Sequence, residues 1–145
     1  MPHPAKYPVG IQDFGEVIHG DYVYVDKTAL MWRLIDTGKY YFLSRPRRFG
    51  KSLLLSTFAA YFGGEKDLFA GLAIAEHTAE WPKHPVLHMD LGGQEYGVRE
   101  DLIERLDWHL KRWEQRYGIT EPDRSVALRF ASVIESAFER EGRHL

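Results

Sequence analysis

The sequence contains no cysteine, which excludes disulfide bonds and thiolate metal sites. It has no run of about eighteen apolar residues, the length that a membrane-spanning helix needs. The first residues, Met1-Pro2-His3-Pro4, lack the apolar core of a signal peptide. The formal net charge is only −2, so no overall excess of one sign attracts the chain to nucleic acid or membrane. These absences predict a cytoplasmic protein with no membrane partner, in which any binding of polyanions is local.

The apolar content is sufficient for one folded domain. The chain has 145 residues, of which 44% are hydrophobic and 14% aromatic, and this length is typical of a single domain. Among candidate metal ligands, His84 and His88 are four residues apart on a predicted strand. That separation spans about 13 Å along a strand, so a metal site built from histidines is not expected.

One stretch, over residues 40–55, is typical of a buried strand, a basic turn and the start of an apolar helix. Its turn ends in Gly50-Lys51-Ser52, which is the second half of a phosphate-binding loop. In such a loop, Gly50 lets the backbone close on the phosphates, Lys51 reaches the β- and γ-phosphates, and Ser52 ligates Mg²⁺ through its hydroxyl. The positive N-terminal end of the helix that follows also favours an anion. The stretch therefore predicts an ATP site with Mg²⁺.

The basic turn departs from the standard pattern at Arg45, where the motif has glycine. Since glycine adopts unusual backbone angles at little cost, this loop must enter its turn differently. No acid lies among its four basic residues, and arginine binds phosphate oxygens bidentately in nucleotides and nucleic acids alike. The predicted nucleotide-binding residues are Arg45, Pro46, Arg47, Arg48, Phe49, Gly50, Lys51, Ser52 and Leu53. The alternative is a non-enzymatic module that contacts nucleic acid or protein through residues 45–51.

Apolar periodicity and breaker residues predict the remaining elements. Helices are expected over Thr28–Thr37, Ser52–Phe62, Arg99–Tyr117 and from a cap at Asp123 to Gly142, with short helical pieces near 13–17 and 66–69. Strands are expected at 22–25, 40–44 and 86–91, after a mostly extended lead-in over 1–20. This order predicts an α/β P-loop NTPase-like three-layer sandwich with a small, mainly parallel and incomplete sheet.

Two acidic positions have alternative interpretations. Asp90 follows an apolar predicted strand, so it resembles a Walker B aspartate that holds Mg²⁺ through water. No acid follows it to act as a base, and an ordinary strand-end aspartate is the other interpretation. Asp26-Lys27-Thr28 either caps the helix that follows or contributes to the nucleotide pocket.

Several of these segments together resemble a known family. The segments Tyr22–Thr28, Tyr41–Leu53, Tyr61–Gly63 and Pro85–Asp90 are similar to the AAA-ATPase-like family of bacteria and archaea. In that family the domain often precedes a PD-(D/E)XK-type nuclease domain. The resemblance covers nearly the whole chain, and the string Arg-Pro-Arg-Arg-Phe-Gly-Lys-Ser is close to a signature, which makes Arg45 a family trait.

The resemblance also implies what residues 1–145 do not contain. In similar proteins the Walker B strand directly follows the helix corresponding to 123–141, so this chain is expected to be the N-terminal part of the domain. Asp90 then belongs to the preceding strand. We expect ATP binding with little or no hydrolysis by this chain, and hydrolysis by the parent protein. Further expectations are self-association through an exposed sheet edge and nucleic acid as a partner of the parent protein. A small P-loop kinase is a weaker alternative.

Overall fold

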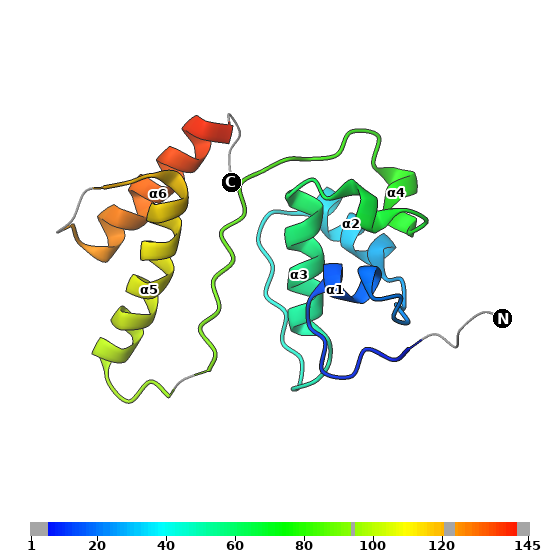
Figure 1. Cartoon of the computed structure of the whole chain (residues 1–145), viewed down its shortest axis with the longest axis horizontal. Coiled ribbons are helices and arrows are strands. Elements are labelled where there is room, and N and C mark those ends of the chain that lie inside the picture. The colour runs from blue at the N-terminus through cyan, green and yellow to red at the C-terminus, as the bar shows by residue number, and fades with distance from the viewer. Residues whose placement is uncertain (1–5, 94, 121–123, 142–145) are drawn as a thin grey trace. The chain divides into compact units, whose positions relative to one another are not determined.

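The computed structural model describes residues 6–93, 95–120 and 124–141, which form helices and irregular segments (Figure 1). The helices are α1 (Phe14–His19), α2 (Thr28–Thr37), α3 (Lys51–Phe62), the 3₁₀ helix η1 (Lys66–Phe69), α4 (Ala73–His77), α5 (Arg99–Tyr117) and α6 (Val126–Glu141). The chain divides into two compact units, Met1–Lys83 and His84–Leu145. Each unit has its own apolar core.

The predicted α/β sandwich with a parallel sheet is wrong. Within residues 6–93, 95–120 and 124–141, the β structure is one isolated parallel bridge between Lys6 and Tyr22. The predicted strands at 40–44 and 86–91 are irregular. A β-prone segment suits a pleated surface, but a strand also needs a second segment to complete the hydrogen-bonded ladder. The predicted self-association therefore has no sheet edge to use in the described part of the chain.

The helix predictions are confirmed. The structure begins α3 at Lys51, one residue earlier than predicted, and also contains α1, α2, η1, α5 and α6 where helices were expected. The predicted stop of α5 at Gly118 is confirmed by its left-handed backbone, with φ of +65°. The short α4 was not predicted. The cap at Asp123 and the stop at Gly142 lie outside the described residues.

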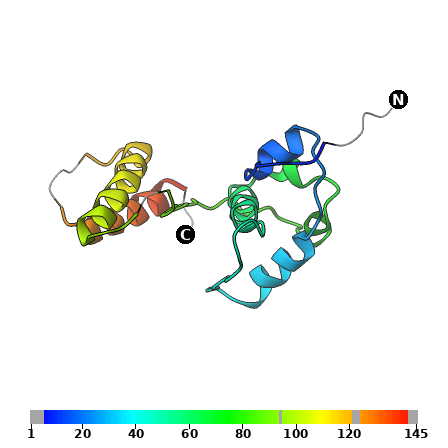
Figure 2. The same cartoon turned by 90° about the horizontal axis from the view of Figure 1, so that it is seen from below.

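The core of the first unit is rich in aromatic side chains. Figure 2 looks nearly along α3 and shows α1 on one side of it and α2 on the other. The centre of this core is Phe69, whose ring centroid lies 4.8 Å from that of Phe14, 5.9 Å from that of Tyr61 and 5.2 Å from that of Trp81. Aromatic side chains bury large apolar areas, so this cluster fixes the position of α3, the helix that begins at the candidate phosphate loop.

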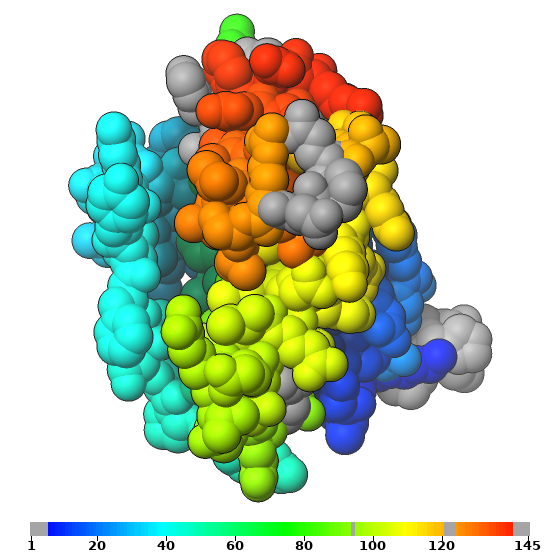
Figure 3. Space-filling view, turned by 90° about the vertical axis from the view of Figure 1, so that its left-hand side faces the viewer, coloured from blue at the N-terminus to red at the C-terminus, as the bar shows by residue number. Residues whose placement is uncertain are grey.

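In the second unit, α5 and α6 lie side by side (Figure 3). The buried residues between them are Leu110, Trp113, Tyr117, Val133 and Ala137. The amide of Ile119 donates to the carbonyl of Glu114, at 2.9 Å, and this bond closes the end of α5.

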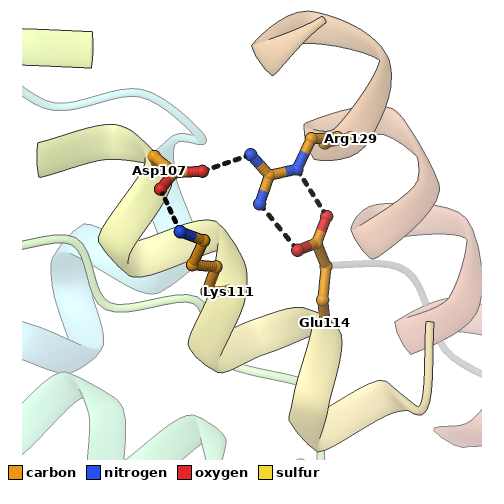
Figure 4. Close-up of polar contacts among 4 residues, drawn as sticks. All are labelled: Asp107, Lys111, Glu114 and Arg129. Carbon is orange, nitrogen blue, oxygen red and sulfur yellow. Dashed lines mark hydrogen bonds and ion pairs between the residues drawn. The ribbon is translucent and has the colours of Figure 1, made fainter. Parts of the chain in front are cut away.

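Arg129 of α6 also links the two helices through its guanidinium (Figure 4). Its Nε and Nη2 each lie 2.7 Å from an oxygen of Glu114, which makes a bidentate pair. Its Nη1 donates to Asp107, which also accepts from Lys111 at 2.8 Å. The hydrogen bond from Lys111 is the largest cause of the lowered pKa of Asp107, and that from Arg129 is the next. The pKa of Arg129 is raised, mainly by its hydrogen bonds to Glu114. These charges therefore stabilise the packing of α6 on α5.

Candidate functional site

The candidate phosphate loop enters α3 through two residues with left-handed backbone. Gly50, the N-cap of α3, has φ of +73°, and Arg48 has φ of +66°. A Cβ at position 50 would meet nothing within 4 Å, so it is the backbone angle that requires glycine there. Arg48 is not glycine, so its left-handed backbone is sterically strained. Strain of this kind concentrates at functional sites.

Lys51 folds back over the loop that precedes it. Its Nζ donates to the carbonyl oxygen of Arg45 at 2.5 Å and lies 3.4 Å from that of Pro46. The side chain is half-buried, whereas the residues from Arg45 to Gly50 are exposed. The ammonium group of Lys51, the first residue of α3, thus lies directly beside the backbone of the loop.

The start of α3 has no side chain that caps it. Its N-cap is Gly50, and no side-chain hydrogen bond is made there; the first helical bond runs from the Leu54 amide to the Gly50 carbonyl, at 2.9 Å. The amides of the first helical turn have no acceptor within their own helix. Together with the helix dipole, they make this end of α3 suitable for an anion.

The other predicted site residues differ in their surroundings. Arg45, Arg47 and Arg48 are exposed, and within the described residues their side chains make no hydrogen bond or ion pair. Ser52 and Phe49 are also exposed. Leu53 is different because its side chain packs against the core of the first unit, so only its backbone is available to a ligand.

Contacts that the sequence did not indicate attach α3 to α1. Ser56 of α3 accepts from the amide of Phe14 at 2.9 Å and donates to Asp13 at 3.1 Å. Asp13 also accepts from the amide of Glu16, at 2.8 Å, as the N-cap of α1. Because a serine in an apolar helix has no distinctive sequence pattern, only the structure identifies this role.

Asp26 and Thr28 cap two helices at once. One oxygen of Asp26 accepts from the amide and hydroxyl of Thr28, at 2.8 and 2.6 Å, and the other accepts from the amide of Ala73, at 2.8 Å. The buried Thr28 hydroxyl in turn accepts from the amide of Ile74, at 3.0 Å. Burial raises the pKa of Asp26, but the hydrogen bonds from Thr28 and Ala73 together lower it below its usual value. The structure thus supports the capping interpretation.

Asp90 lies in the second unit, whereas the loop 45–53 lies in the first. Its carboxylate accepts from the amide of Gly92 at 2.8 Å. Its carbonyl oxygen accepts from Arg105 Nε at 3.0 Å and contacts His109 Nε2 at 2.8 Å. Since a carbonyl can only accept, His109 carries a proton on Nε2. The described residues contain no group of three or more histidine, aspartate or glutamate side chains that could hold a metal ion.

The comparisons with known proteins give a family. A family model described as "Predicted AAA-ATPase" matches residues 8–145. The chain belongs to the AAA-ATPase-like family. The AAA-ATPase-like chain is also 41% identical over 141 residues to an "Uncharacterized protein in vnfD 5'region" from Azotobacter chroococcum mcd 1. That alignment covers 97% of the chain but 27% of the relative, so the chain spans little more than a quarter of that protein.

No solved structure matches this AAA-ATPase-like chain. Among the described residues, every helix is too short or too polar to cross a membrane.

Proposed function

We propose that this AAA-ATPase-like chain binds ATP with Mg²⁺ through the loop Arg45–Leu53. The observation that carries the proposal is the start of α3, where an uncapped helix terminus, the left-handed Gly50 and the ammonium of Lys51 come together. The uncapped amides are donors, the Lys51 ammonium is a positive charge, and the left-handed Gly50 sets the turn between them; such a set suits a polyphosphate.

Each residue of the loop has a role in this proposal. The backbone amides from Arg47 to Ser52 surround the phosphates, and the exposed arginines add positive charge. Within the described residues the hydrogen bonds of the Lys51 ammonium go to two carbonyl oxygens, and it would exchange them for phosphate oxygens, because hydrogen bonds between charged groups are stronger. The Ser52 hydroxyl would hold Mg²⁺, which neutralises charge on the phosphates.

We propose binding without hydrolysis for residues 1–145. Phosphoryl transfer to water needs a group that orients the attacking water and an acid that helps to hold Mg²⁺. Among the described residues, no carboxylate makes a hydrogen bond or ion pair with a side chain of the loop 45–52. Hydrolysis by longer members of the family stays a prediction.

The test is titration calorimetry of Mg·ATP with the wild-type chain and with Lys51→Ala, with turnover followed in the same samples. Hydrogen bonds to charged groups contribute roughly 1.5–3 kcal/mol, so we expect Lys51→Ala to weaken binding by at least about tenfold. The matched control is Lys39→Ala, which removes an exposed lysine outside the loop. Equal affinity of the wild type and Lys51→Ala would contradict the proposal, as would turnover that survives the substitution.

A second candidate function uses the same loop for nucleic acid. It is favoured by the exposure of Arg45, Arg47 and Arg48, which have no acidic partner in the described residues. In that case Lys51→Ala would weaken DNA binding, which would depend steeply on salt, and Mg·ATP would not compete. Competition by Mg·ATP would instead support the nucleotide site.

A further inference from the structure

One face of α5 carries three arginines and a tryptophan. Arg105, Arg112 and Arg116 are separated by seven and four residues, so they lie on one side of the helix with Trp108 among them. The guanidinium carbon of Arg105 lies 4.8 Å from the centre of the Trp108 ring, and that of Arg112 lies 4.7 Å from it. These cation–π contacts hold two of the positive groups in place. We term these four residues the arginine face.

The arginine face forms one side of an open groove of about 490 Å³ within the second unit. The other side is the segment 86–90, which contributes His88 and Asp90. The bonds from Arg105 and His109 to the Asp90 carbonyl fix this segment beside the helix. The groove is therefore built by specific polar contacts.

The charge in the groove is mainly positive. On the α6 side of α5, Asp107 and Glu114 are occupied by Lys111 and Arg129 (Figure 4). The carboxylate among the lining residues is that of Asp90, which accepts from the Gly92 amide. Among the charged residues that line the groove there are thus three arginines and one carboxylate.

We propose that this groove binds single-stranded nucleic acid through its phosphodiester backbone. Guanidinium groups bind phosphate oxygens bidentately, and a positive groove with aromatic side chains is typical of single-strand binding. From Arg105 to Arg116 the helix rises about 16 Å, which is longer than one phosphate group and fits a chain of them. The segment 86–90 lies along this face of α5, so the helix is not free to enter the major groove of a duplex.

The guanidinium planes that lie over Trp108 provide surfaces for the bases. Trp108 is 44% exposed although two guanidinium groups lie over its ring. Arginine planes and aromatic rings both stack with unpaired bases, and this stacking tolerates any sequence. The groove therefore binds without strong sequence preference.

The test is fluorescence anisotropy of a labelled twelve-nucleotide single-stranded DNA of mixed sequence, titrated with the full chain at several salt concentrations. The logarithm of affinity should fall with the logarithm of salt with a slope of about −2 for three phosphate contacts, at about −0.7 each. We expect Arg112→Gln to weaken binding at least about fivefold and to make the slope less steep by about 0.7. Arg112→Lys, which keeps the charge, should retain most of the slope.

The matched control is Lys111→Gln, which removes a neighbouring charge that pairs with Asp107 outside the groove. We expect its affinity to stay within about twofold of the wild type, and circular dichroism checks that each variant is folded. Absence of binding at about 50 mM salt overturns the proposal. The proposal is also overturned if Lys51→Ala weakens DNA binding and Arg112→Gln does not, because the DNA then binds to the loop 45–53. Equally tight binding of inorganic tripolyphosphate or of a DNA duplex also overturns it.

Discussion

The two arginine-rich regions of this chain present their charges in different ways. In the loop 45–51, the arginines are exposed on an irregular backbone, and two left-handed residues set the geometry. On the arginine face, a regular helix fixes the spacing, and the Trp108 ring holds two guanidinium groups. In the loop the backbone conformation would therefore determine how an anion is bound, whereas on α5 the stacking of side chains would determine it. Substitutions in one unit should leave the other region intact.

The largest effect is expected from Arg129→Ala, which would break the contact between α5 and α6. It leaves Glu114 and Asp107 without their shared partner, and the Arg129 and Glu114 side chains are only 14% and 13% exposed. We expect the free energy of unfolding of the second unit to fall by about 2–4 kcal/mol. Urea unfolding followed by circular dichroism measures this change.

The control for Arg129→Ala is Lys111→Ala, whose side chain is 67% exposed and which should change stability by less than about 1 kcal/mol. Affinity for Mg·ATP should be the same in both variants, since the loop 45–53 belongs to the first unit. If Arg129→Ala abolished nucleotide binding, the separation between the two regions would be refuted.

An intermediate effect is expected from Gly50→Ala, which tests the loop without removing a charge. An alanine at φ of +73° costs roughly 1–2 kcal/mol, so the loop should relax toward another conformation. We expect affinity for Mg·ATP to fall at least about fivefold in calorimetry. DNA binding by the arginine face should not change. Gly97→Ala is the control because its added Cβ would make only an ordinary contact, 3.7 Å from Asp101.

The smallest effect is expected in the pH dependence of stability, which can be compared between the two units. Asp26 in the first unit and Asp107 in the second both have a lowered pKa in the folded state. Each therefore stabilises its unit above the unfolded pKa of about 3.9 and loses that contribution as pH falls through its folded pKa. Urea unfolding between pH 6 and pH 3 should show less acid sensitivity in Asp26→Asn and Asp107→Asn. An unchanged pH profile in both variants would show that these carboxylates are not linked to folding.

Local signals predicted the helices correctly, but they also predicted a sheet that the described residues do not form, and they did not indicate the groove. Periodic apolar residues predicted α5 and α6, and Gly50-Lys51-Ser52 marked the start of α3. The β-prone segments at 40–44 and 86–91 could not become strands without hydrogen-bonded partners, which local propensity does not specify.

The arginine face was missed for a similar reason. Charged residues such as Arg112, on the polar side of an amphipathic helix, are typical of an ordinary solvated surface. Their spacing around Trp108 is visible in the sequence, but the segment 86–90 that completes the groove comes from elsewhere in the chain. Side chains on a helix surface acquire a site only when a distant segment lies beside them.

The double cap made by Asp26 has a consequence for the order of folding. Asp26 and Ala73 are 47 residues apart, so their hydrogen bond closes a ring of chain that contains the whole loop 45–53. Closing a ring of that size costs about 3 kcal/mol of chain entropy beyond a constant term. Turns of α2 and α3 can form from local contacts first. The hydrogen bond between Asp26 and Ala73 needs the two ends of the ring to meet, so it forms after them. The candidate phosphate loop thus lies in the segment of chain that this late, long-range hydrogen bond closes.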